Sequence, residues 1–140
     1  MPLRQVVAAE GQYYHVYNRG ALRTILYYSP KMYTMFLSLM MMFAELCKVS
    51  IIALCLMPNH FHILIRVNEG GRADRFLMLL CGVYSKRINK DLRRTGTIFE
   101  GRYKIKHVKT NSYFKCLCKY IHRNPVKAGL VTHPGSWMYS

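Results

Sequence analysis

The stretch Met57-Pro58-Asn59-His60-Phe61-His62-Ile63-Leu64-Ile65-Arg66-Val67 decides how this chain folds. Its apolar, β-branched second half follows the turn-forming pair Pro58-Asn59, which predicts a β-strand. Side chains alternate between the two faces of a strand, so His60 and His62 are expected on one face and Phe61 on the other. Two imidazoles side by side on a rigid strand are suited to form half of a metal site, and a structural or solvent-facing histidine pair is the alternative interpretation.

The composition indicates a globular protein that meets a polyanion. Of the 140 residues, 51% are apolar, which fits one compact domain over residues 1–140. The 21 lysines and arginines outnumber the six acidic residues and give a formal charge of +15. Nucleic acid is therefore the first candidate partner, and an ordinary basic or ribosome-associated protein is the alternative.

Cysteine usage and hydropathy indicate a cytoplasmic protein. The five cysteines are an odd number without a Cys-x-x-Cys pair, which favours reduced thiols over a disulfide framework. The N-terminus lacks the apolar region of a signal peptide. The apolar run at residues 35–44 is too short to cross a membrane and predicts a buried helix. We therefore expect a cytoplasmic, nucleoid-associated protein with no membrane partner.

Four strands and three helices are predicted along the chain. The strands are expected at residues 12–17, 50–56, 60–67 and 98–109. Two helices are expected at residues 30–48 and 72–92, and a last helix begins at Thr110-Asn111-Ser112 and ends at Pro125. The two middle strands are close enough to form an antiparallel hairpin. The order β-α-β-β-α-β predicts an α+β fold, a ferredoxin-like antiparallel sheet with helices on one face plus the C-terminal helix.

The last predicted helix carries two stripes of side chains. Phe114, Leu117 and Ile121 recur at the spacing of a core face. Tyr120 and Asn124 lie one turn apart on a second stripe. A phenol and an amide carried together towards the two histidines would complete a plausible active site.

Several segments resemble the HUH endonuclease superfamily, whose motif is a pair of histidines around one hydrophobic residue. The segment His60-Phe61-His62 matches that motif. Further matches are Tyr14-His15-Val16, Asn18-Arg19-Gly20, Phe99-Glu100-Gly101-Arg102-Tyr103-Lys104 and Lys119-Tyr120-Ile121-His122-Arg123-Asn124-Pro125-Val126-Lys127-Ala128-Gly129-Leu130-Val131. Taken together in this order, they are similar to a single-tyrosine transposase of the insertion-sequence-200-like group, on the REP-associated tyrosine transposase side.

The resemblance implies a function and a set of site residues. Such enzymes cut and rejoin single-stranded DNA near imperfect palindromes, through a covalent 5′-phosphotyrosine link that leaves a free 3′-hydroxyl. By this resemblance Tyr120 is the nucleophile, and His60, His62 and Asn124 are ligands of Mg²⁺ or Mn²⁺. The expected protein is a metal-dependent DNA transposase that acts on hairpin-bearing single-stranded ends as a monomer or a homodimer.

Cationic side chains are candidates for contacts with DNA phosphates. They are Arg19, Lys86, Arg87, Arg94, Arg102, Lys104, Lys106 and Arg123. An ordinary solvated surface is the alternative interpretation of the same residues.

Other interpretations of the site stay open. Tyr84 is a second candidate nucleophile, although its apolar neighbours favour packing and Ile88, not a polar ligand, follows one turn later. His15, on the first predicted strand, could approach the site, but a role in the core or against DNA is favoured. A domesticated or inactive protein that grips DNA hairpins without cutting is the alternative function. A ferredoxin-like RNA-binding domain is less favoured, because the aromatic motifs expected on its central strands are missing.

Overall fold

Four antiparallel strands form one sheet in the order β2-β3-β1-β4. The computed structural model describes residues 8–133, 135 and 137–139. The strands are β1 (Tyr13–Arg19), β2 (Val49–Met57), β3 (His60–Val67) and β4 (Lys104–Val108). The helices are η1 (Ala21–Arg23), α1 (Pro30–Leu46), α2 (Ala73–Asp91) and α3 (Asn111–Lys127). This strand order and connectivity confirm the predicted α+β, ferredoxin-like sheet.

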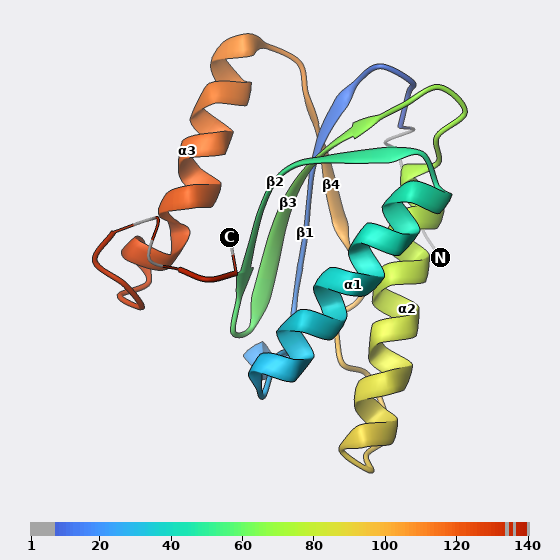
Figure 1. The fold of residues 1–140 in the computed structure, drawn as a ribbon, viewed down its shortest axis with the longest axis vertical. Coiled ribbons are helices and arrows are strands. Elements are labelled where there is room, and N and C mark those ends of the chain that lie inside the picture. The colour runs from blue at the N-terminus through green and yellow to red at the C-terminus, as the bar shows by residue number, and fades with distance from the viewer. Residues whose placement is uncertain (1–7, 134, 136, 140) are drawn as a thin grey trace.

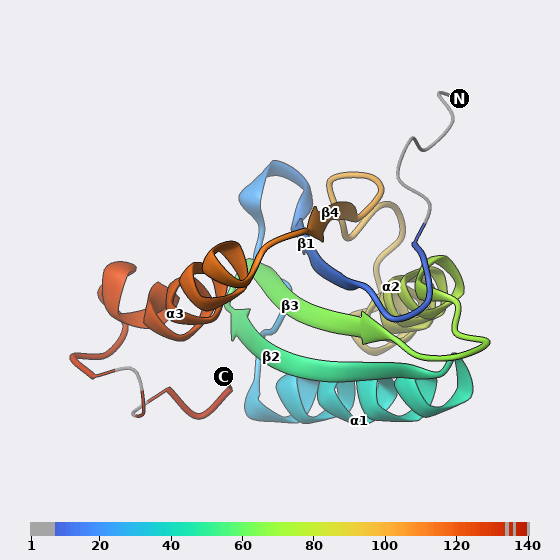
Figure 2. The same cartoon turned by 90° about the horizontal axis from the view of Figure 1, so that it is seen from above.

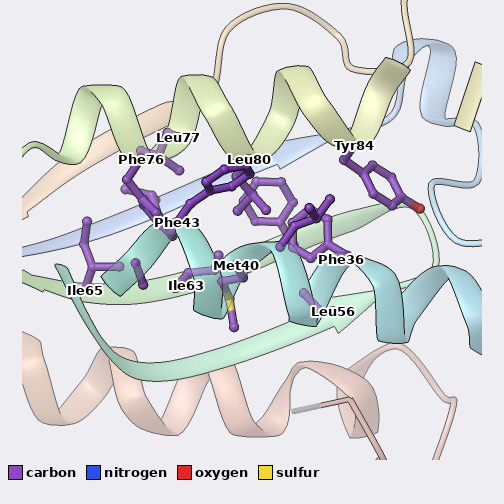
Figure 3. Close-up of a cluster of buried hydrophobic side chains, with 14 of the residues drawn as sticks. Phe36, Met40, Phe43, Leu56, Ile63, Ile65, Phe76, Leu77, Leu80 and Tyr84 are labelled. Atoms are coloured by element: carbon purple, nitrogen blue, oxygen red, sulfur yellow. The ribbon is translucent and has the colours of Figure 1, made fainter. Parts of the chain in front are cut away.

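Helices α1 and α2 lie together on one face of the sheet, and α3 lies apart from them beside the opposite face (Figures 1 and 2). The larger core fills the space between α1, α2 and the sheet, as Figure 3 shows. Its side chains include Phe36, Met40, Phe43, Leu56, Ile63, Ile65, Phe76, Leu80 and Tyr84. Each fully buried side chain of this size stabilises the fold by about 1.5–3 kcal/mol. This core makes the sheet a rigid support for whatever projects from its other face.

A bulge in β2 determines which of its side chains lie on the face that α3 covers. The pairing of β2 with β3 shifts between Ile51 and Ala53, which leaves Ile52 as an extra residue. Beyond the bulge, Ala53 and Cys55 point to the same side as Leu64 and lie in the smaller core under α3. Because side chains alternate along a strand, the bulge decides which residues of β2 face this helix.

The tip of the β2–β3 hairpin is held by the loop after β1. The backbone N–H of Gly20 donates to the carbonyl of Asn59 at 2.8 Å, and the N–H of Leu26 donates to the carbonyl of Pro58 at 2.7 Å. A β-carbon at Gly20 would lie 2.1 Å from the carbonyl oxygen of Thr24, so only glycine fits there. The start of β3, where the first histidine stands, is thereby fixed from outside the hairpin.

Two predicted elements differ from the structure. The strand expected at residues 98–109 is formed only at Lys104–Val108, because Phe99 turns into the helix-side core and Gly101 takes a φ of 130°. Pro125 does not end the last helix, which continues to Lys127. The Pro125 ring removes one N–H donor, but the final turn is closed by bonds from Ala128 to the Asn124 carbonyl and from Leu130 to the Pro125 carbonyl, both at 3.0 Å.

The C-terminal segment returns to the sheet and covers the outer edge of β2. The indole of Trp137 donates to the carbonyl of Leu56 at 2.9 Å, and the N–H of Leu56 donates to the carbonyl of Tyr139 at 2.9 Å. The ring of Tyr139 stacks on Tyr33 of α1 with centroids 3.8 Å apart. These two bonds occupy the outer edge of β2 at Leu56, where another strand could otherwise pair. Over the residues that the structure describes, no helix has both the length and the apolar character to span a membrane.

Candidate active site

The two histidines of β3 and the tyrosine of α3 meet on the face of the sheet opposite α1 and α2. The rings of His60 and His62 lie edge to face with centroids 5.2 Å apart. The ring of Tyr120 lies edge to face with His62 at a centroid separation of 5.3 Å. Strand alternation thus aims both imidazoles at one side, as the sequence predicts. Tyr120 is 44% exposed, so solvent can reach it.

The position of Tyr120 follows from how α3 begins and which side it buries. Thr110 is the N-cap, and its hydroxyl accepts a bond from the N–H of Tyr113 at 3.1 Å. Leu117 and Ile121 are buried in the smaller core, which fixes the rotation of the helix about its axis. The second stripe therefore faces the histidines and the cavity beside them, and the predicted two-stripe pattern of this helix is confirmed.

Like His62, Asn124 is a buried polar residue of the group. Its side chain is only 8% exposed and interacts with His60. The residue lies one turn beyond Tyr120, so a single helix delivers both the phenol and the amide to the histidines. The structure thus brings together the four residues that the sequence singled out.

Both histidines are held through their Nδ1 atoms. The Nδ1 of His60 lies 2.7 Å from Oδ1 of Asn59, and the Nδ1 of His62 lies 2.9 Å from Nε2 of His15. An amide oxygen only accepts, so the first bond makes His60 a donor at Nδ1 and leaves a lone pair at Nε2. Outer hydrogen bonds of this kind orient histidines that bind metals and select their tautomer.

Burial keeps the imidazoles of the site uncharged at neutral pH. Burial, assisted by the neighbouring His15 and His60, lowers the pKa of His62 from 6.5 to about 3. Burial and the nearby Lys106 ammonium lower the pKa of His15 from 6.5 to about 4. Burial also lowers the pKa of His60, although its interaction with Asn124 opposes that shift. A neutral imidazole is the form that binds metal ions.

The donor set suits a divalent cation with an open coordination sphere. In the described part of the chain, no three His, Cys, Asp or Glu side chains converge on one metal site. Asparagine is not one of these four residue types. The amide oxygen of Asn124 could complete a set of three ligands with the nitrogens of His60 and His62. Two nitrogens and one oxygen leave positions for a phosphate oxygen and water. This set is softer than the all-oxygen sites that Mg²⁺ favours and suits Mn²⁺ well.

The predicted phosphate contacts fall into two groups. Lys104 and Lys106 of β4 project to the same face as the histidines, since they pair with Tyr17 and His15 of β1. The Arg19 guanidinium forms an ion pair with Glu100 beside the site. Arg102 precedes β4, Arg123 lies on α3, and both are exposed. Lys86, Arg87 and Arg94 belong to α2 or to the turn after it, across the sheet.

Tyr84 packs in the core, as its neighbours predict. It is fully buried, and its hydroxyl donates to the carbonyl of Leu26 at 2.5 Å. The sequence reasoning missed Asn59, which contacts His60, and it favoured the core or DNA for His15, which the structure places against His62. The ferredoxin-like strand order, which places β1 beside β3, is the signal that could have pointed to His15.

Comparisons with known proteins identify the family of this chain and solved structures with the same fold. Residues 8–124 match the sequence profile of the family described as "Transposase IS200 like". A search of curated proteins found no match. A solved REP-associated tyrosine transposase bound to a REP hairpin superposes with a TM-score of 0.82 and 17% identity, covering 99% of this chain and 81% of that one.

A second solved structure, described as a transposase from Deinococcus radiodurans, gives a TM-score of 0.58 at 16% identity. The match covers 88% of this chain and 96% of that one. At these identities the solved structures bear on the fold alone. The family profile extends from before β1 to Asn124 and includes both histidines and Tyr120. The chain belongs to the family of IS200-like transposases.

Proposed function

We propose that this protein cuts and rejoins hairpin-bearing single-stranded DNA through a covalent link to Tyr120. The contact between the Tyr120 ring and the His62 ring, at 5.3 Å between centroids, is the observation that carries the proposal. It supports the proposal because a solvent-accessible phenol lies next to two neutral imidazoles of the same chain. The hairpin preference is supported by the solved relative, which is described as bound to a REP hairpin.

The proposed cleavage is a transesterification. The phenolic oxygen of Tyr120 attacks the scissile phosphorus, and the bond from phosphorus to the 3′-oxygen of the preceding nucleotide breaks. The phenolic proton is given up to solvent and the departing 3′-oxygen takes one up, which leaves a free 3′-hydroxyl and a 5′-phosphotyrosine. Attack by another 3′-hydroxyl reverses the step and rejoins a strand, so no external energy source is needed.

Under this proposal His60, His62 and Asn124 hold a divalent cation, Mg²⁺ or Mn²⁺. When bound there, the cation would polarise the scissile phosphate and offset negative charge that develops in the transition state. The residues of the chain do the rest. Asn59 and His15 keep the two imidazoles oriented, and the buried hydrophobic side of α3 keeps the phenol beside them. Lys104 and Lys106 provide positive charge on the same face for the DNA backbone.

A covalent-adduct assay tests the proposal. The labelled single strand that flanks the gene, with its hairpin, is incubated with the protein and Mn²⁺ and then denatured. Wild-type protein is expected to retain label, and Tyr120→Phe is expected to retain none. Tyr28→Phe is the matched control, because Tyr28 is exposed and lies before α1, across the sheet from the histidines.

Two results would contradict parts of this proposal. An adduct that persists in Tyr120→Phe would show that another residue is the nucleophile. Tight binding of the hairpin with no adduct under Mn²⁺ or Mg²⁺ would favour the alternative, a protein that grips hairpins without cutting them.

A further inference from the structure

Two cavities flank Tyr120, one on each side of the proposed cleavage centre. The first has a volume of about 650 Å³ and opens between α3 and the sheet. The second has a volume of about 540 Å³ and extends over His60 towards Arg23 and Glu100. Tyr17, His62 and Tyr120 line both, so they form the wall between them. A DNA strand whose scissile phosphate lies at this wall must place the neighbouring nucleotides on either side of it.

The first cavity combines aromatic surface with positive charge. Beyond the shared wall, its lining includes Tyr113, Cys116 and Leu117 of α3 and Lys106 of β4. No carboxylate is among the described residues that line it, whereas the second cavity contains Glu100. The Lys106 ammonium lies 5.9 Å from the centroid of the Tyr17 ring. Flat apolar surface beside a cation suits a planar heterocycle attached to a phosphate.

Tyr113 is the residue of this lining that is free to stack on a ligand. Tyr113 lines the cavity and is 41% exposed. Its backbone N–H, and not its ring, makes the capping bond to Thr110. The start of α3 therefore does not need the ring of Tyr113. The ring is available to contact a ligand in the cavity.

We infer that the first cavity binds one unpaired nucleobase of the nucleotide next to the scissile phosphate, stacked on the ring of Tyr113 with its backbone near Lys106. This inference rests on the proposed function, because that function places the scissile phosphate at Tyr120. A nucleotide held here would be splayed out of any stack with its neighbour, and this would orient the phosphate for attack.

A fluorescence scan with 2-aminopurine tests the inference. The probe is the hairpin-bearing single strand that flanks the gene, carrying 2-aminopurine at one unpaired position at a time. Wild-type protein is expected to quench the fluorescence most strongly at one position next to the cleavage site, and Tyr113→Phe is expected to behave the same. Tyr113→Ala should lose that quenching, whereas Tyr28→Ala, which removes an exposed tyrosine outside this cavity, should keep it.

Affinity for abasic DNA provides the second measurement. Removing the base at that position should weaken wild-type binding about ten-fold, which is the scale of one base–aromatic stack. Tyr113→Ala should bind the intact DNA more weakly than wild type, and removing the base should not weaken its binding further. Equal quenching at all positions, or a Tyr113→Ala protein that matches wild type throughout, would overturn the inference.

These outcomes are separable from those of the adduct assay. Positional quenching without any adduct would overturn the proposed cleavage and leave the base site standing. An adduct without positional quenching would overturn the proposed base site and leave the proposed cleavage standing.

Discussion

His15 and His62 face each other across the neighbouring strands β1 and β3, with Nε2 of the first 2.9 Å from Nδ1 of the second and the two rings stacked. One of these nitrogens must carry the hydrogen, and each choice fixes a tautomer of His62. If His62 donates, its Nε2 lone pair is available to a cation. If His15 donates, that lone pair is replaced by an N–H.

We expect His15 to act as a positioning residue for His62. His15→Leu would leave the buried Nδ1 without a partner and is expected to weaken Mn²⁺ binding about 10- to 100-fold, the usual effect of losing such an outer contact. His15→Gln offers an amide oxygen as acceptor and should recover most of the affinity. Calorimetric titration with Mn²⁺ measures both, and ¹⁵N NMR of the imidazoles reports the tautomer without metal. Unchanged affinity in His15→Leu would contradict this role.

Asn124 is expected to contribute an oxygen to the cation. Asn124→Ala should weaken Mn²⁺ binding, whereas Asn124→Asp should retain or strengthen it because a carboxylate oxygen is the harder and more basic ligand. His107→Gln is the matched control, since His107 bonds Gln12 and points to the opposite side of β4. If the alanine and aspartate variants bind Mn²⁺ equally, the amide is no ligand.

The metal-free protein should lose stability as the pH falls below 6.5. The pKa values of His15 and His62 are lowered to about 4 and about 3 in the fold, whereas the unfolded chain takes up these protons near 6.5. Between these values the unfolded state binds more protons, so each histidine reduces the free energy of unfolding by up to about 1.4 kcal/mol per pH unit.

Urea denaturation with a chelator, at pH values between 6.5 and 5, measures this slope. His15→Gln should give a shallower dependence than wild type, because one of the histidines with a lowered pKa is gone. Parallel curves for the two proteins would show that His15 does not stay neutral in the fold.

Gly20 is expected to matter for both stability and the site. A methyl group in Gly20→Ala would collide with the Thr24 carbonyl, with a cost of about 1–3 kcal/mol in the free energy of unfolding. Because the N–H of Gly20 binds the carbonyl of Asn59, the shift should also disturb His60 and reduce Mn²⁺ affinity. Gly82→Ala in α2 meets no atom within 4 Å and should stabilise the protein by about 0.5–1 kcal/mol. Urea titration of both variants compares them, and equal stabilities would exclude the predicted collision.

The local patterns predicted most of the elements and their faces. Alternation placed His60 and His62 together, and the three- and four-residue spacing in the last helix separated Leu117 and Ile121 from Tyr120. The predicted strand at residues 98–109 was too long because alternation alone cannot show that Phe99 packs in the core on the helix side. The helix likewise passes Pro125, since one missing donor does not prevent a last turn closed by other bonds.

By itself, the sequence determined the elements that carry the chemistry, because the periods of strand and helix are local properties of the backbone. Only the tertiary structure decided which of these elements meet. The strand order puts His15 against His62, the bulge at Ile52 turns small residues of β2 under α3, and the packing of Leu117 and Ile121 brings Tyr120 to the histidines. Contacts between segments far apart in the chain depend on how whole faces pack together, and no single stretch of sequence contains that information.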